Sequence, residues 1–226
     1  MEEKRNMNEI YNVIILDKSG SMSSIRRQAV GGVNECIGSI KASQTKNPEI
    51  KQYVSLVAFC SCELKVIYDT VPVEKVTKMT ARDYAPCCCT PLYDAIGNTI
   101  TRVHKHILDN ENAIVNVTII TDGYENASQE FSYKAIKALI ESYKNEGWMF
   151  AYIGADHDVE SVAFDLSIDN ALQFEKTEEG TEKMFERFTG AMEHRQAVIA
   201  ERLCVPMSPA ERKKMIKSSN SNFFNK

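Results

Sequence analysis

Short apolar stretches alternate along the chain with longer segments in which apolar residues recur every three or four positions. The stretches "YNVIIL", "YVSLVAF", "AIVNVTII" and "WMFAYI" are rich in β-branched and aromatic residues, which is typical of buried strands. In contrast, Leu92, Ile96, Ile100 and Val103 fall on one face of a helix. Strands that alternate with helices in this way predict a mostly parallel sheet covered by helices on both faces.

The same pattern predicts the individual elements. Helices are expected from about residue 24 and at 91–108, 131–145, 158–165 and 178–203, and strands are expected at 11–17, 53–59, 63–69, 113–123, 148–155 and 170–176. Only three residues separate 53–59 from 63–69, so these strands are predicted to form a hairpin in which one strand is antiparallel. We therefore predict an α/β, doubly wound, Rossmann-like fold. Its six-stranded sheet is mostly parallel, with one antiparallel edge strand and helices on both faces.

Composition and charge divide the chain into a body and a tail. With 43% hydrophobic and 26% charged residues, the 226-residue chain has the composition of a globular domain. Its net charge is −4, but residues 207–226 hold five basic residues and one acidic residue, so the rest carries −8. We expect an N-terminal extension at 1–9, a domain at 10–205, and a basic tail at 206–226 that is flexible or forms a short helix on a partner.

Two features predict a cytoplasmic protein. The chain contains no apolar run near the ~18 residues of a membrane span, and the apolar stretch near its N-terminus is too short for a signal peptide. Seven cysteines are an odd number, which favours reduced thiols over a disulfide framework.

Aspartates follow two of the predicted strands. Asp17 and Asp122 lie at strand carboxyl ends, and Thr90 begins the segment that enters a predicted helix. In an open parallel sheet these positions share one rim, where ligands bind. In "DKSGSM", alternate residues of an extended turn project to the same side, so Ser19 and Ser21 are expected to face the same point as Asp17.

This donor set consists of oxygen atoms alone. Carboxylates and hydroxyls suit a hard divalent cation, so Mg²⁺ is the expected metal and Mn²⁺ is an acceptable substitute. The predicted metal-site residues are Asp17, Ser19, Ser21, Thr90 and Asp122.

Three separated motifs, "DKSGSM", "TPLYDAIG" and "TDGYEN", resemble the metal-ion-dependent adhesion site of von Willebrand factor A (VWA) domains, the family that includes integrin inserted domains. "GWMFAYIGAD" is similar to a strand of intracellular bacterial members. The resemblance implies that Ser19, Ser21 and Thr90 bind the metal, while Asp17 and Asp122 bind it directly or through water. It also implies that a partner protein's Asp or Glu completes the coordination, in an adaptor or assembly factor that is not an enzyme.

The cysteines depart from the family pattern. Cys87, Cys88 and Cys89 stand where related proteins commonly have glycines before Thr90. The favoured interpretation is a tight loop that accepts small side chains, and the alternative is a switch, sensitive to redox state or to a soft metal, that acts on the position of Thr90. Cys60 and Cys62 fall in the predicted hairpin turn and are interpreted as lacking a second Cys/His pair, so zinc is not predicted there.

Two other functions stay open at the level of sequence. Aspartates at strand ends with Mg²⁺ also serve phosphoryl-transfer and hydrolytic enzymes, but the chain has no aspartyl-nucleophile motif, P-loop or nucleophile elbow. An RNA-associated role is disfavoured by the acidic body and by the lack of RNA-binding motifs. The identity of the partner and the oligomeric state are not predicted.

Asp94 and Glu125 lie near the site in sequence but are left out of the ligand set.

Overall fold

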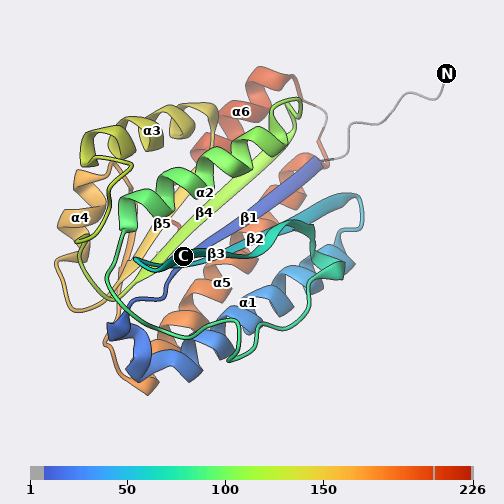
Figure 1. Cartoon of the computed structure of the whole chain (residues 1–226). Helices are drawn as coiled ribbons and strands as arrows, with labels where there is room; N and C mark the ends of the chain where they lie inside the picture. The colour runs from blue at the N-terminus through green and yellow to red at the C-terminus, as the bar shows by residue number, and fades with distance from the viewer. Residues whose placement is uncertain (1–7, 206, 225–226) are drawn as a thin grey trace.

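A six-stranded sheet forms the centre of the molecule in the computed structural model, which describes residues 8–205 and 207–224. The strand order is β3-β2-β1-β4-β5-β6 (Figure 1). Neighbouring strands pair in parallel except β2 and β3, which pair antiparallel at one edge. The predicted sheet and its antiparallel edge strand are therefore confirmed. The strands are β1 (Asn8–Asp17), β2 (Ile50–Cys60), β3 (Glu63–Pro72), β4 (Ala113–Thr121), β5 (Met149–Gly154) and β6 (Asn170–Gln173).

Helices cover both faces of this sheet, as predicted. Figure 1 shows α2, α3 and α4 on one face and α1 and α5 on the other. The α-helices are α1 (Arg26–Lys46), α2 (Leu92–Ile107), α3 (Tyr133–Glu146), α4 (Val159–Asp165), α5 (Glu178–Leu203) and α6 (Pro209–Ser218). Two 3-10 turns, η1 (Gly20–Ile25) and η2 (Val73–Lys75), follow β1 and β3. The helix expected from about residue 24 therefore begins as a 3-10 turn, and its α-helical part starts at Arg26.

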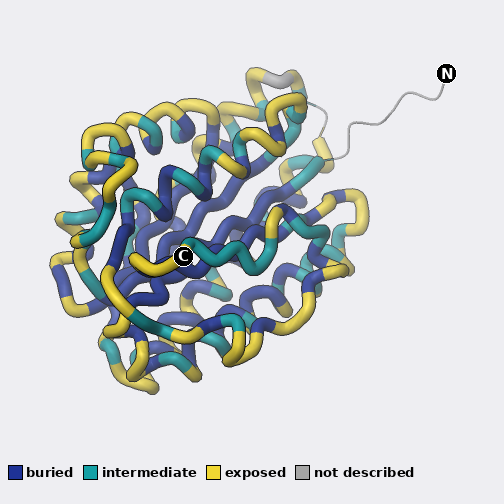
Figure 2. The backbone as a smooth tube through the Cα atoms, viewed as in Figure 1, coloured by how far each residue is buried: buried dark blue, intermediate teal, exposed yellow. Residues whose placement is uncertain are grey.

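The alternation of side chains along β1 explains why the strand is apolar over residues 13–16. Ile14 and Leu16 belong to the core beneath α1 and α5, whereas Val13 and Ile15 belong to the core beneath α2 and α3. Because successive side chains of a strand point to opposite faces, a strand covered on both faces needs apolar residues at nearly every position. Figure 2 shows the resulting buried strands within a shell of more exposed helices and loops.

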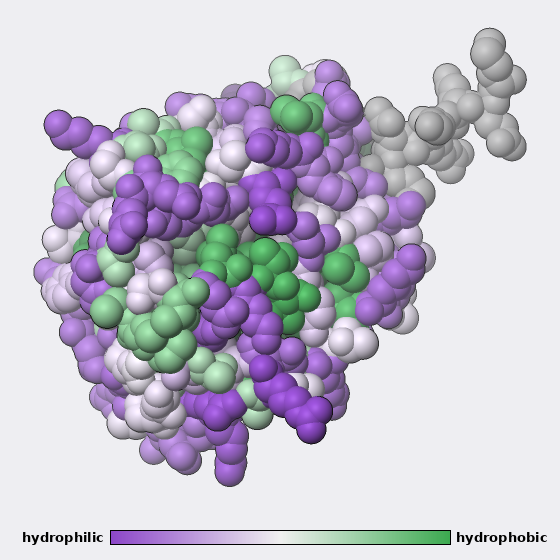
Figure 3. Space-filling view, in the orientation of Figure 1, coloured by the Kyte–Doolittle hydropathy of each residue, from purple (hydrophilic) through white to green (hydrophobic). Residues whose placement is uncertain are grey.

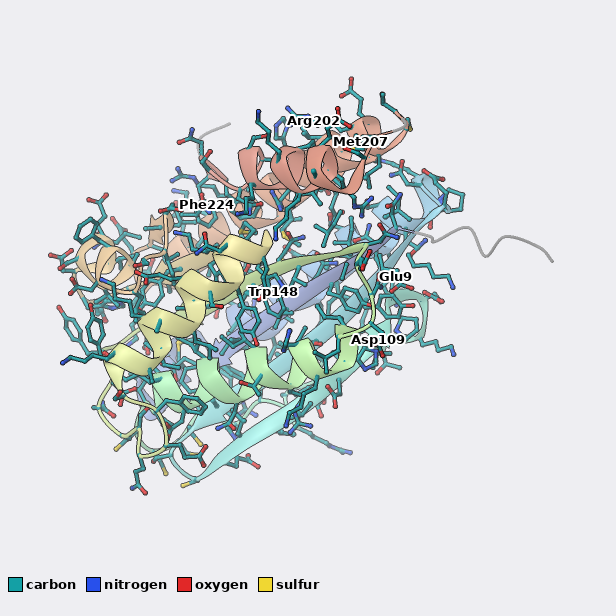
Figure 4. All side chains as sticks on the ribbon, turned by 90° about the horizontal axis from the view of Figure 1, so that it is seen from above. Glu9, Asp109, Trp148, Arg202, Met207 and Phe224 are labelled. Carbon is teal, nitrogen blue, oxygen red and sulfur yellow. The ribbon has the colours of Figure 1, made fainter. Side chains whose placement is uncertain are left out.

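The tail forms a short helix, as one of its two predicted states has it, but the helix packs against the domain itself rather than against a partner. Residues 209–218 form α6, whose first turn has a capping box in which the Ser208 side chain accepts the Glu211 N–H and Glu211 accepts the Ser208 N–H. Ile216, Phe223 and Phe224 are buried. Figure 4 shows α6 between the labelled residues Met207 and Phe224. The expectation of a flexible tail is wrong for residues 207–224, because apolar side chains near the end of the chain join the core.

A buried arginine holds this tail against the sheet. Arg195 of α5 donates to Asn116 Oδ1 of β4 (2.9 Å), to the carbonyl oxygen of Ser219 (2.7 Å) and to Asn220 Oδ1 (2.7 Å). Burial lowers the pKa of Arg195 to about 10. The tail therefore supplies the acceptors for both terminal nitrogens of the guanidinium, while Asn116 of the sheet accepts from Nε.

Some predictions concern the ends and the surface of the chain. The expected N-terminal extension, 1–9, lies outside the described residues except for Asn8 and Glu9, which begin β1. None of the helices in the described part of the chain is both long enough and apolar enough to cross a membrane.

The face seen in Figure 3 is largely hydrophilic, with hydrophobic side chains gathered near its centre.

The contact between α1 and α5 depends on a glycine. A Cβ on Gly32 would lie 2.0 Å from Phe185 Cγ, whereas a Cβ on the adjacent Gly31 would meet no atom within 4 Å. Phe185 is buried, and its Cγ is fixed close to its backbone. The two helices can therefore approach closely only because position 32 has no side chain.

We predict that Gly32→Ala lowers the free energy of unfolding by about 1–3 kcal/mol, since overpacking outweighs the gain in helix propensity. The matched control, Gly31→Ala, should raise it by about 0.5–1 kcal/mol. Urea unfolding of the two variants measures both changes. Equal stabilisation by the two substitutions would contradict the close contact.

Candidate metal centre

The two predicted aspartates lie at neighbouring strand ends. Asp17 ends β1, and Asp122 directly follows β4, which pairs in parallel with β1. Thr121 Oγ1 donates to Asp17 Oδ2 at 2.6 Å, and Ser21 Oγ donates to Asp122 Oδ1 at 2.6 Å. Side chains from both strand ends therefore form one hydrogen-bonded cluster, as the rim rule predicts.

The turn after β1 brings its two serines together. Ser19 N–H donates to Asp17 Oδ1 at 2.6 Å, a local bond that folds the chain back over the aspartate. Ser19 Oγ and Ser21 Oγ lie 3.0 Å apart. Asp17, Ser19 and Asp122 are buried, whereas Ser21 is exposed. The carboxylates of the cluster are thus shielded from solvent, and solvent reaches the cluster at Ser21.

Hydrogen bonds of the Thr90 backbone and of the residues just before it hold this loop at the same rim. Its N–H donates to Asn126 Oδ1 at 2.8 Å, and Asn126 N–H donates to the Thr90 carbonyl oxygen at 3.1 Å. Just before it, Cys88 O accepts the Gly20 N–H at 3.0 Å, and Cys87 N–H donates to Lys18 O at 2.9 Å. The Thr90 side chain is buried. All five predicted residues therefore lie at the carboxyl ends of β1 and β4 and in the loops that these contacts join.

Burial makes the charge of this cluster costly. Burial, with a smaller contribution from the neighbouring Asp122, raises the pKa of Asp17 to about 6, although hydrogen bonds from Thr121 and Ser19 oppose the shift. Asp122 Oδ2 accepts no hydrogen bond from the described residues. Two carboxylates in such surroundings need a cation nearby.

A lysine that the sequence analysis missed supplies one positive charge. Lys176 Nζ lies 2.8 Å from Asp122 Oδ2 and 3.5 Å from Asp156 Oδ2. Because Asp122 Oδ2 takes part in no well-aligned hydrogen bond, the 2.8 Å contact is an ion pair. Burial lowers the pKa of Lys176, but the carboxylates of Asp122 and Asp156 raise it by more, so the net shift is upward. Lys176 lies just after β6, and the rim rule that selected Asp17 could also have selected it.

The donor set fits a hard divalent cation. It contains two buried carboxylates, of which Asp122 Oδ2 is paired with the Lys176 ammonium, and two serine hydroxyls 3.0 Å from each other. Oxygen donors of this kind suit Mg²⁺ and Mn²⁺ rather than metals that prefer sulfur or imidazole.

The neighbouring acidic residues have other partners. The Glu125 carboxylate accepts the N–H groups of Tyr93 (2.9 Å), Ala127 (2.8 Å) and Ser128 (2.7 Å). Asp94 accepts three further N–H groups, those of residues 129, 130 and 131. These carboxylates hold the loop after β4 against the start of α2.

The structure corrects one reading of the cysteines. Zinc was not predicted at Cys60 and Cys62 because the sequence shows no second pair nearby. In the fold, Cys87 Sγ lies 3.4 Å from Cys60 Sγ, and Cys88 Sγ lies 2.8 Å from Cys62 Sγ. A second pair is therefore present, supplied by the loop that precedes Thr90.

Comparisons with known proteins identify the fold. No family model matches the chain, and no curated protein matches it. Solved structures do match, among them a von Willebrand factor type A protein from Catenulispora acidiphila (15% identity, TM-score 0.60, 82% of this chain and 43% of that chain). The chain has a VWA fold. Two further matches are the vWF domain of the type V pili tip protein Mfa5 from Porphyromonas gingivalis (10%, 0.59, 82% and 95%) and the SpRpn10 VWA domain (13%, 0.54, 80% and 94%).

These structural similarities come with low sequence identity and, for some matches, partial coverage of the matched chain. At 10–15% identity they show the VWA fold alone. The chain also spans less than two thirds of some matched chains, including 43% of the Catenulispora protein and 61% of the PilB minor pilin from Streptococcus sanguinis. The VWA fold implied by the three motifs is confirmed.

The buried carboxylates generate a prediction for metal-free protein. In Asp17→Asn, the amide oxygen can still accept the Ser19 N–H while the amide nitrogen donates to Thr121 Oγ1, and one buried negative charge is removed. In EDTA above pH 6 we expect the variant to be about 1–3 kcal/mol more stable than wild type in urea unfolding. The gain should vanish toward pH 4, because the raised pKa of Asp17 means that wild type loses stability as the pH rises from 3.8 to about 6.

Asp94→Asn is the matched control for this experiment. The Asp94 carboxylate accepts three N–H groups, two at one oxygen and one at the other. In the asparagine the amide nitrogen replaces one oxygen and cannot accept an N–H, so this substitution should destabilise the chain. A less stable Asp17→Asn variant in EDTA would show that the charge at position 17 is already compensated.

Proposed function

We propose that the chain is a metal-dependent protein-binding module. Asp17, Ser19, Ser21, Thr90 and Asp122 hold Mg²⁺ or Mn²⁺, and an Asp or Glu of a partner protein completes the coordination. The observation that carries this proposal is that hydroxyls of Ser21 and Thr121 contact two buried carboxylates at one rim of a VWA fold, while the loop that leads to Thr90 is hydrogen-bonded to the same 17–21 turn.

Each residue has a distinct part in this proposal. The hydroxyls of Ser19, Ser21 and Thr90 are neutral donors, while Asp17 and Asp122 contribute negative charge directly or through water. When bound, the metal supplies an electrophilic position to which a carboxylate oxygen of the partner can bind. Because neutral hydroxyls make up much of the donor set, the metal keeps its attraction for one more anion.

The rim around the site suits a contact with another protein. Ser21 is exposed, so a partner can reach the cluster, and Tyr124, two residues after Asp122, is 56% exposed. Exposed tyrosines often anchor protein interfaces, since they bury a large area with little loss of conformational freedom. These features favour binding of a protein surface around the metal.

We further propose a cytoplasmic adaptor or assembly factor of the bacterial type rather than an enzyme. All seven cysteines are free thiols, which suits a reducing compartment. His157, the histidine that follows β5, uses both ring nitrogens in contacts with Tyr152 Oη (3.0 Å) and the Ala155 carbonyl oxygen (2.5 Å). It is therefore engaged in structural hydrogen bonds rather than placed as a free base.

Calorimetric titration with Mg²⁺ and Mn²⁺ tests the metal site. We expect wild type to bind one ion, and Thr90→Ala to bind it at least about tenfold more weakly because a ligand is lost. Thr99→Ala is the matched control, since Thr99 is an equally buried threonine in α2 whose hydroxyl makes no hydrogen bond among the described residues. Folded wild type that takes up no metal at millimolar concentration would overturn the proposal.

Affinity capture tests the partner. Immobilised wild type, but not Thr90→Ala, should retain a protein from the source cells in Mg²⁺ and release it in EDTA. Replacement of one Asp or Glu of the captured protein should abolish retention. Retention that persists in EDTA, or recovery of RNA in place of protein, would contradict a metal-bridged protein contact.

Lys176 gives a separate prediction about affinity. Its ammonium occupies Asp122 Oδ2 and would repel a dication at the same cluster, so Lys176→Met should bind Mn²⁺ about tenfold more tightly. The control is Lys183→Met, which removes an exposed ion pair with Glu179. Calorimetry compares the two, and an unchanged or weaker affinity of Lys176→Met would show that Lys176 supports the site instead of competing for it.

A further inference from the structure

Four cysteine sulfurs converge beside the oxygen cluster. Cys60 ends β2, Cys62 lies in the turn before β3, and Cys87 and Cys88 lie in the loop that leads to Thr90. The sulfurs of Cys60, Cys62 and Cys87 all lie within 4.8 Å of one another. Cys88 Sγ lies 2.8 Å from Cys62 Sγ but more than 4.8 Å from at least one of the other two, so it can join them once its side chain turns.

Backbone contacts between the two segments bring these sulfurs together. Ser61 N–H donates to the Cys89 carbonyl oxygen at 3.0 Å, and Cys89 N–H donates to Ser61 Oγ at 3.1 Å. Ser61 lies between two of the cysteines and Cys89 directly follows the other two. The convergence is therefore fixed by the loop pairing and does not require contact between the thiols.

The spacing of Cys60, Cys62 and Cys87 is close to that of three ligands of a tetrahedral thiolate site. With metal–sulfur bonds of about 2.3 Å, the sulfurs of such a site lie about 3.8 Å apart. The Cys60–Cys87 distance is 3.4 Å, and the Cys62–Cys88 distance of 2.8 Å requires these two sulfurs to separate by about 1 Å. Both Cys62 and Cys88 are exposed, so their side chains have room to turn.

We propose that Cys60, Cys62, Cys87 and Cys88 form a second metal site, which binds Zn²⁺ or a similarly soft divalent cation through thiolates. Sulfur ligands favour such a cation, whereas the oxygen cluster favours Mg²⁺ or Mn²⁺. The two sites therefore select different metals although they lie on neighbouring loops. This inference does not depend on the proposed protein-binding function.

The second site would also act on the position of Thr90. The Cys87–Cys88 segment is bonded to the turn after β1 through Lys18 O and the Gly20 N–H, and Thr90 follows two residues later. Zinc bound to all four thiolates would join the β2–β3 turn to this segment by metal–sulfur bonds. It would thus hold the loop that carries one of the proposed Mg²⁺ ligands.

Zinc binding to the full chain tests the proposal. Reduced, metal-free protein is titrated with Co²⁺ as a spectroscopic probe and then with Zn²⁺ against a chromophoric chelator. We expect one ion per chain, a thiolate-to-cobalt charge-transfer band that Zn²⁺ displaces, and at least about 100-fold weaker zinc binding by Cys62→Ser combined with Cys88→Ser. Both substituted cysteines are exposed, so the double variant should fold.

Controls separate this site from other thiols and from the oxygen cluster. Cys89→Ser removes an exposed cysteine of the same loop, and Cys204→Ser removes a remote one, so both should bind zinc as wild type does. Asp17→Ala should also keep full zinc affinity, even if it abolishes Mg²⁺ binding. The proposal is overturned if wild type gives no thiolate band, if the Cys62/Cys88 double variant binds zinc normally, or if the two pairs form disulfides that persist in reductant and exclude the metal.

Discussion

Two buried carboxylates at the ends of adjacent parallel strands are the constraint on which the rest of this molecule depends. Asp17 and Asp122 lie where β1 and β4 end, and the fold removes both side chains from water. Negative charge in such a place must be offset by hydrogen bonds and by a cation. The protein provides N–H and hydroxyl donors from the 17–21 turn and Thr121, and one ammonium from Lys176. A divalent metal at the same rim would offset the remainder.

The two ends of the sheet differ in what they contain: one carries the polar loops, and the other is covered by α6. At the carboxyl ends of the strands, three loops are joined by hydrogen bonds and carry polar groups. At the other end, α6 closes the core, where Ile216 packs with the first residues of β1, β2 and β4 and with the end of α5. The stability supplied at the closed end allows the other end to keep costly buried charge, which is common at functional sites.

Much of this arrangement could be predicted from the sequence, because it depends on local pattern and on a general rule of parallel sheets. The apolar runs gave the strands, the three-residue gap gave the antiparallel edge, and strand ends gave the neighbourhood of Asp17 and Asp122. The remaining features depend on contacts between distant segments. The pairing of Ser61 with Cys89 brings four cysteines together. Lys176 follows the edge strand β6, two strands away from β4, and still contacts Asp122. The tail was misjudged from its charge, although "SPAE" holds a readable capping box and Phe223 and Phe224 are typical core residues.

The most direct test of the central claim is anomalous diffraction from a crystal soaked in millimolar Mn²⁺. If the buried carboxylates are held for a divalent cation, an anomalous peak will lie within about 2.5 Å of oxygens from Ser19, Ser21 and Thr90, and Lys176 Nζ will have moved away from Asp122. A peak-free map, with the ammonium still paired to Asp122, would show that the lysine alone balances the charge and would contradict the account.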